Sequence, residues 1–326
     1  MKHLTILVPE GENNLSSIVG TYKIFSRANA CRNAAGKAEI FKIELAGVSD
    51  EVSFHGGLFT ARPHTHIDNI QNTDLVIVPS LSHNYLHTTN LNGEIIEWIG
   101  RQYRNGAELA SICTGAYLLA AAGLLDGKIC STHWSTAEQL KQLYPKVNVQ
   151  TDKLITDEQG IYTNGGGYSF LNLVLYLIEK YYDRETAIFC SKVFQIELDR
   201  DSQSEFIIFK GQRSHNDELV KKAQEYLENA LTDKLSVERL AASFAIGRRN
   251  FDRRFIKATG NTPVEYAQRV RIEAAKKAFE TTRKNVNEVM YDVGYADMKA
   301  FREVFRRITG MSPLDYRNRY NKDAAA

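Results

Sequence analysis

The stretch 108-ELASICTGAYLLAAAGLLDGK-128 places a cysteine between a strand-like run and a helix-like run. The residues before Cys113 form a short apolar run typical of a buried strand, and residues 116–125 are apolar at helical spacing. Thr114 and Gly115 suit the tight turn between them. We therefore expect Cys113 at a strand-to-helix corner. There its thiol faces unbonded helix amides, whose partial positive charge favours a thiolate and would hold an oxyanion.

Similar elements alternate through the first two-thirds of the chain. The strand-like runs are 3–9, 39–48, 74–80, 107–113 and 159–165, and the helix-like runs include 92–104, 115–123 and 168–182. Alternation of this kind predicts an α/β fold, a flavodoxin-like parallel sheet sandwiched by helices. Ligands in such folds bind beyond the carboxyl ends of the strands, and Cys113 follows one such end.

Length and composition set wider limits. A chain of 326 residues is longer than a single hydrophobic core usually supports, which suggests two domains. No apolar run approaches the ~20 residues that span a bilayer, and the N-terminus lacks a signal-peptide pattern, so we expect a cytoplasmic protein without membrane contact. The four cysteines show no zinc-like spacing. We expect neither a metal nor a cofactor.

The overall charge of +2 conceals an asymmetry between two parts of the chain. Residues 1–210 hold 18 Lys and Arg against 23 Asp and Glu, a net of −5, whereas residues 211–326 hold 23 against 16, a net of +7. A small basic domain beside a larger acidic one suggests a polyanion as its partner. A solvated helix face remains the alternative.

The C-terminal third contains a repeat. Residues 251-FDRRFIKATGNTPVEYAQR-269 align without gaps on 301-FREVFRRITGMSPLDYRNR-319, at an offset of fifty residues. Each copy has an aromatic pair at i, i+4, then a Gly suited to a helix end, then Thr-Pro or Ser-Pro with an acidic residue as in a capping box. The sequence thus predicts two copies of one structural unit.

Each copy follows a short helix and a turn that contains Gly247 or Gly294. A short helix, a turn and a basic helix with a buried aromatic face form the pattern of a helix-turn-helix. Residues 264–282 between the copies are expected to form one continuous amphipathic helix. A rigid helix would fix the separation of the two units, and adjacent major grooves on one DNA face lie ~34 Å apart.

Residues 215–322 resemble the double helix-turn-helix DNA-binding domain of AraC-type transcription regulators. The motifs that carry this resemblance are LSVERLA, FDRRFIKATGNTPVEY, RIEAA and VGYADMKAFREVFRRITGMSPLDYR. It implies double-stranded DNA as the partner, with the second helix of each unit in the major groove. The candidates that face bases are Arg249, Asp252, Arg253, Met298, Lys299 and Glu303. The candidates for phosphate contacts are Arg248, Arg254, Arg302 and Arg306.

Some of these assignments have competing interpretations. Arg253 could bind a guanine edge through two hydrogen bonds. Glu303 stands where the family usually has Arg; it could accept from cytosine, but we favour an i, i+4 salt bridge with Arg307. Any one Arg could equally be a solvated side chain.

The first 195 residues resemble the PfpI/ThiJ-type domain, which is class I glutamine-amidotransferase-like. The matching text is ELASICTGAYLLAAAGLLDGK, STHW at 131–134 and YPKVNV at 144–149. This domain joined to an AraC-type tail is the arrangement of the GlxA-like branch of regulators. It implies a sensor domain at 1–195, a linker at 196–214, and the DNA-binding domain at 215–322. The text RDSQSEF at 200–206 resembles the junction usual in that branch.

Departures from the enzymes of that superfamily argue against turnover. Related hydratases carry an Asp near the thiol where this chain has Ser17, so the most obvious proton carrier is missing. The Gly-rich loop after the third strand is altered, and Thr114 follows the thiol where superfamily proteases have His. We therefore expect a catalytically inactive domain that senses a small metabolite and helps to form a homodimer.

The expected ligand-pocket residues are Cys113, Thr114, Gly115, His133 and Ser17. Cys113 could instead be a small buried apolar side chain, and His133 could make only a structural hydrogen bond. A Cys113-dependent amidase or hydratase with an accessory DNA-binding domain is the competing hypothesis. Oxidation of Cys113 to sulfenic acid is a third.

Overall fold

The computed structural model describes residues 1–82, 84–198, 200–213, 215–233 and 235–321. The chain divides into two compact units, Met1–Gln203 and Ser204–Ala326. Residues 199 and 214 of the expected linker, and residue 322 at the expected domain end, lie outside the described residues.

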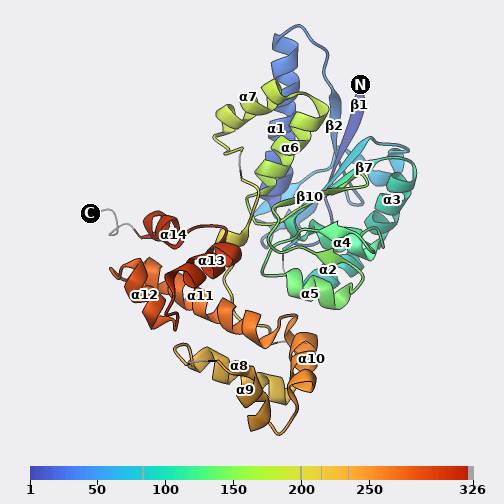
Figure 1. Cartoon of the computed structure of the whole chain (residues 1–326). Coiled ribbons are helices and arrows are strands. Elements are labelled where there is room, and N and C mark those ends of the chain that lie inside the picture. Colours follow the sequence, from blue (N-terminus) through green and yellow to red (C-terminus); the bar gives the residue numbers. More distant parts are fainter. Residues whose placement is uncertain (83, 199, 214, 234, 322–326) are drawn as a thin grey trace. The chain divides into compact units, whose positions relative to one another are not determined.

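The first unit is built on a seven-stranded sheet of order β10-β11-β7-β6-β1-β2-β5 (Figure 1). Its strands are β1 (Lys2–Leu7), β2 (Phe41–Gly47), β5 (Thr65–His66), β6 (Leu75–Val78), β7 (Glu108–Ile112), β10 (Ile155–Glu158) and β11 (Ile161–Asn164). All neighbours pair in parallel except β10 and β11, which form an antiparallel edge. The expected parallel α/β sheet is confirmed, and the edge strands β5 and β10 are additions that the sequence did not indicate.

Helices cover both faces of this sheet. One face packs against α1 (Leu15–Ala34), α6 (Phe170–Tyr181) and α7 (Arg184–Phe194). The other packs against α3 (Gly93–Arg104), α4 (Ala116–Ala121) and α5 (Ala137–Leu143). Strand β6 is apolar and buried on both sides, and β7 is buried from Leu109 to Ile112, because each face of the sheet has its own core. The remaining elements are α2 (Tyr85–Leu91) and the short pairs β3 (Val52–Phe54) with β4 (Phe59–Ala61) and β8 (Ile129–Cys130) with β9 (Asn148–Val149).

The second unit is helical and contains two separate cores. Its helices are α8 (Glu218–Asn229), α9 (Val237–Ser243), α10 (Arg248–Thr259), α11 (Pro263–Thr281), α12 (Val286–Asp292), α13 (Met298–Thr309) and α14 (Pro313–Tyr320). The first core gathers α8, α9, α10 and the start of α11, and the second gathers the rest of α11 with α12, α13 and α14. The long helix α11 therefore joins the two helix-turn-helix units, as expected (Figure 1).

The two units end their basic helices in the same way. Gly260 and Gly310 have φ of 69° and 78°, the left-handed conformation that Gly adopts without a Cβ clash. Thr262 then caps α11 in a capping box with Glu265, and Ser312 caps α14. The repeated sequence thus produces a repeated structure.

Two negative findings apply to the described ranges only. Among them, no helix combines the length and the apolar character needed to cross a bilayer. No cluster of three or more His, Cys, Asp or Glu side chains there is placed to hold a metal ion.

Candidate functional site

Cys113 lies at the corner between β7 and α4, in a backbone conformation that is rare for any residue but Gly. Its φ is +53° and its side chain is 3% exposed. Two buried side chains hold this strained residue in place. Asn164 Oδ1 accepts from the Cys113 amide at 3.1 Å, and Thr132 Oγ1 donates to the Cys113 carbonyl oxygen at 2.9 Å. Such strain persists only where neighbouring groups over-determine it, as at many functional sites.

Gly115 allows the corner to sit against the end of β6. A Cβ at this position would lie 2.6 Å from the Pro79 carbonyl oxygen and 2.7 Å from that of Val78. Both of these atoms belong to the backbone, so they cannot move aside cheaply. A glycine is therefore required for the close approach of the two segments.

The thiol of Cys113 is surrounded by hydroxyl and amide groups, yet its environment favours the neutral form. Burial raises the pKa of the Cys113 thiol, and hydrogen bonds with Ser80, Thr114 and the backbone of His133 oppose that rise without reversing it. The helix start therefore acts against a desolvation that favours the neutral thiol. Desolvation outweighs the few helix amides of a six-residue helix.

Ser17 supports the site without touching the thiol. Its hydroxyl donates to the Asn14 carbonyl oxygen at 2.7 Å and accepts from the Ser80 amide at 3.2 Å. Ser80 in turn shares a hydrogen bond of 2.9 Å with Thr114, whose hydroxyl reaches the Leu81 carbonyl oxygen at 2.6 Å. Ser17 thus holds the backbone of Ser80, whose hydroxyl in turn bonds Thr114.

His133 faces the site with its backbone. Its Nδ1 lies 2.7 Å from Ser135 Oγ and accepts from the Ser135 amide at 3.2 Å, so the ring is engaged locally. Burial lowers the pKa of His133, which favours a neutral imidazole. The structure therefore brings together Cys113, Thr114, Gly115 and the His133 backbone.

Sequence reasoning missed Ser80, Thr132 and Asn164, which complete the corner. These residues lie 19 to 51 positions from the residues they bind and carry no local pattern. Tyr85 was also missed. Burial raises the pKa of Tyr85, the nearby Cys113 thiol raises it further, and the Tyr85 ring stacks on Tyr117 with centroids 4.5 Å apart.

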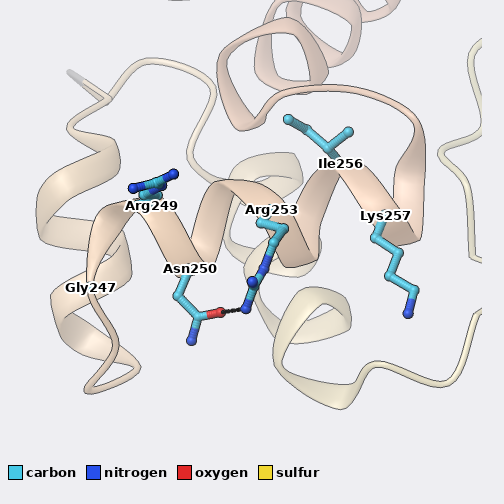
Figure 2. A pocket seen from close by; sticks show the side chains of 6 residues that line it. All are labelled: Gly247, Arg249, Asn250, Arg253, Ile256 and Lys257. Carbon is cyan, nitrogen blue, oxygen red and sulfur yellow. Dashed lines mark hydrogen bonds between the residues drawn. The ribbon is translucent and has the colours of Figure 1, made fainter.

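In the second unit, α10 presents a basic face to solvent. Figure 2 shows Arg249, Asn250, Arg253, Ile256 and Lys257 along an open hollow that begins at Gly247. Arg249 and Arg253 are exposed, and Arg253 Nη2 donates to Asn250 Oδ1 at 3.1 Å. The opposite face carries Phe251 and Phe255 into the core. The aromatic pair therefore orients the arginines outward.

Three other candidates on α10 are engaged within the unit. Arg248 Nε lies 2.7 Å from Asp252 Oδ2, and Arg248 also pairs with Glu238 of α9. Arg254 binds both carboxylate oxygens of Asp217 at 2.7 and 2.9 Å. These pairs tie α10 to α9 and to the start of α8.

The corresponding face of α13 carries Lys299, Arg302, Glu303 and Arg306, all exposed. Met298 is half-buried and packs against the second core. The salt bridge that we favoured for Glu303 is absent from the described residues, because Arg307 donates instead to Gln268 Oε1 at 2.5 Å. Glu303 is thus an exposed carboxylate among three cations.

The sequence model of the DJ-1/PfpI family matches residues 6–180, and that of a helix-turn-helix domain matches residues 240–319. The chain belongs to the DJ-1/PfpI family. Together the two matches confirm the predicted architecture, a DJ-1/PfpI domain followed by an AraC-type helix-turn-helix domain.

Two relatives of this DJ-1/PfpI chain share both parts. The HTH-type transcriptional regulator GbdR of Pseudomonas aeruginosa is 28% identical over 225 residues, which are 69% of this chain and 61% of GbdR. The HTH-type transcriptional regulator GlxA of Rhizobium meliloti is 26% identical over 67% of this chain and 68% of GlxA. The aligned region thus spans less than two thirds of GbdR. Both relatives are named as regulators and neither as an enzyme.

A solved structure supports the fold of the first unit. A ThiJ/PfpI family protein from Pseudomonas syringae has a TM-score of 0.51 at 18% identity, covering 61% of this chain and 76% of that protein. At this identity the likeness shows the fold alone.

Proposed function

We propose that this DJ-1/PfpI chain is a sequence-specific DNA-binding transcription regulator. The observation that carries the proposal is the repetition of one exposed basic helix, α10 and α13, on two cores that the single helix α11 joins. Two exposed basic helices that are joined by one continuous helix can enter two successive major grooves of a duplex. The names of GbdR and GlxA support the same role. A partner of this kind would place the protein in the cytoplasm.

The exposed side chains fall into two roles in this proposal. Arg249, Arg253 and Lys299 point away from the cores and would meet base edges, and Arg253 would contact a guanine through two hydrogen bonds. Arg302 and Arg306 would contact phosphates, which position the protein without reading sequence.

Four further candidates take more limited parts. Arg248 would reach a phosphate only by sharing its guanidinium with Asp252, and Asp252 would keep Arg248 in place. Met298 would offer only its exposed tip to a thymine methyl group. Glu303 would repel a phosphate or accept a hydrogen bond from a cytosine amino group.

Fluorescence anisotropy with duplex fragments of the source genome tests the proposal. We expect binding to one or a few fragments that is at least a hundredfold tighter than to the rest at ~150 mM salt. Arg253→Ala should weaken specific binding by about 1–3 kcal/mol. Arg104→Ala is a matched control, because Arg104 is exposed on α3 of the first unit. Equal affinity for every fragment, or none, would reject the proposal.

We propose that the first unit binds a small nitrogenous or carboxylated metabolite at the Cys113 corner. Cys113, Thr114 and Gly115 would line the pocket, His133 would offer its backbone amide, and Ser17 would hold the Ser80 loop. The strained Cys113 backbone and its buried hydroxyl surroundings support a built pocket. A shift in melting temperature across a metabolite panel, lost in Cys113→Leu, is the expected result.

We further propose that this pocket performs no turnover. Burial raises the pKa of its thiol, Ser17 stands in place of a carboxylate, and the His133 ring is bound to Ser135. A nucleophile in such a site lacks both a low pKa and a base. Incubation with small amides and nitriles should release no product above that of Cys113→Ala, and product release that depends on Cys113 would revive the amidase or hydratase hypothesis.

We also propose a homodimer, because two copies of the DNA-binding unit on one operator would bind more tightly than one copy. Light scattering coupled to size-exclusion chromatography should give twice the chain mass of 36.9 kDa. A mass of one chain at micromolar concentration would reject this part.

A further inference from the structure

The segment 201–211, which we name the strap, is anchored at both of its ends. Its first part pairs with residues 152–154 in the first unit. The Leu154 amide donates to the Asp201 carbonyl oxygen at 3.1 Å, and the Gln203 amide donates to that of Asp152 at 3.0 Å. This part of the strap thus forms an added edge beside the β10 end of the sheet.

Gln203 enters the wall of the Cys113 corner. Its side chain is 1% exposed, and its Nε2 donates to the Thr132 carbonyl oxygen at 2.9 Å and to that of Lys153 at 3.2 Å. Thr132 is the residue whose hydroxyl holds the Cys113 carbonyl oxygen. The Gln203 amide also fills the space over Gly165, where a Cβ would lie 2.1 Å from Nε2.

Gly165 directly follows Asn164, whose Oδ1 binds the Cys113 amide. Gln203 therefore binds Thr132, which holds the Cys113 carbonyl oxygen, and lies against Gly165, the neighbour of the residue that holds the Cys113 amide. Gln203 Oε1 is buried and has no hydrogen-bond partner within the described ranges. In the buried position this oxygen therefore lacks a hydrogen bond, which water would supply if the side chain left the site.

The rest of the strap is anchored in the second unit. The short 3₁₀ turn η3 (Ser204–Phe206) packs against α13, and Glu205 Oε2 accepts from Arg319 of α14 at 2.6 Å. Lys276 of α11 then donates to the Ile207 carbonyl oxygen at 2.5 Å.

Further along, the Phe209 amide donates to Glu273 Oε2 at 3.1 Å, and the Phe209 ring meets Tyr266 edge-on at 5.2 Å. The strap thus contacts α13, α14 and α11 in turn. It passes from the second helix-turn-helix core to the first.

Gln203 and Ser204 are adjacent in the chain, both buried, and held in different units. The contacts of the strap with the first unit and its contacts with the second unit therefore meet at the Gln203–Ser204 peptide bond. We propose that Gln203 couples the Cys113 corner to the DNA-binding unit through the strap. This inference rests on the proposed function for its biological meaning, and its physical content is a coupling between two sites in one chain. Because coupling between sites is reciprocal, a change in the second unit must alter the corner.

The test is the rate at which iodoacetamide alkylates Cys113 in the full chain, measured by mass spectrometry of the peptide that contains it. Phe209→Ala removes a strap contact that lies entirely in the second unit. We expect it to raise the rate at least threefold. Glu273→Gln, which removes the carboxylate that receives the Phe209 amide, should act in the same direction and serves if Phe209→Ala does not fold.

Gln203→Ala is the decisive partner in a double-mutant cycle. Gln203→Ala should raise the alkylation rate by itself. When Phe209→Ala is added to Gln203→Ala, the rate should rise by no more than about a tenth of the rate in Gln203→Ala. Gly165→Ala should also raise the rate, and less so when Gln203→Ala has removed the clashing amide. Gln139→Ala, an exposed glutamine on α5, and Val293→Ala, a buried truncation in the second core, are the controls and should leave the rate unchanged.

An unchanged rate in both Phe209→Ala and Glu273→Gln would overturn the proposal. So would an increment from Phe209→Ala that persists in full without the Gln203 side chain, or an equal increase in Val293→Ala. No DNA is used in these measurements. Failure to bind DNA would therefore reject the proposed function and leave the coupling to be judged on these rates alone.

Discussion

The repeat makes a paired prediction about stability in the second unit. Phe251 and Phe301 occupy equivalent positions, both are 0% exposed, and their rings lie 5.7 and 5.8 Å from Phe255 and Phe305. Truncation of a buried Phe to Ala costs about 3–5 kcal/mol through lost burial and a residual cavity. We therefore expect Phe251→Ala and Phe301→Ala to destabilise their cores by similar amounts within that range.

The chain offers a natural way to separate the two units in this experiment. Its two tryptophans, Trp98 and Trp134, both lie in the first unit, so tryptophan fluorescence reports that unit alone. Circular dichroism at 222 nm also reports the helices of the second unit. In urea, each substitution should lower the midpoint of the second unit's dichroism transition by on the order of 2 M. The fluorescence transition should stay where it is.

Because the two phenylalanines belong to separate cores, the costs should add in the double variant within about 0.5 kcal/mol. A loss below about 1.5 kcal/mol at either site would contradict the packing described here. A fluorescence midpoint that moves as far as the dichroism midpoint would contradict the division into units.

Three further predictions concern single sites. Gly115→Ala should lower the melting temperature of the first unit by several degrees, since its Cβ meets backbone oxygens; an unchanged value in differential scanning calorimetry would show that the corner is looser than described. Because burial raises the pKa of the Cys113 thiol, its alkylation should accelerate only as pH rises above ~9, and a rate that levels off below pH 8 would contradict the neutral thiol. The hydrogen bond from Arg254 is the largest cause that lowers the pKa of Asp217. The pair should therefore stabilise the second unit above pH ~4 and lose that effect as pH falls through the lowered value. Asp217→Asn should remove this acid dependence, whereas retention of the wild-type profile would assign it elsewhere.

Local patterns were enough to predict most of the second unit. Phe251 and Phe255, their copies fifty residues later, and the Gly-x-Thr/Ser-Pro ends specify where helices begin, end and face the core. Those signals act over one or two turns, so they survive in any tertiary context. The parallel sheet was also legible, because its buried strands are short and apolar.

The parts that escaped prediction depend on contacts between distant residues. Asn164 and Thr132 reach Cys113 across 51 and 19 residues, and no periodicity marks an amide or hydroxyl for that role. The pKa of the Cys113 thiol is raised by a burial that only the folded chain imposes, so the helix start alone could not predict its direction. Gln203 lies in a polar stretch that sequence alone would leave as linker.

The most direct test of the central claim is the salt dependence of DNA affinity. Log Kd for a selected duplex should rise linearly with log salt, with a slope that reflects several phosphate contacts. Arg302→Ala combined with Arg306→Ala should reduce that slope by about two contacts, while Arg104→Ala leaves it unchanged. A slope near zero, or one that the paired substitution on α13 does not alter, would contradict the account.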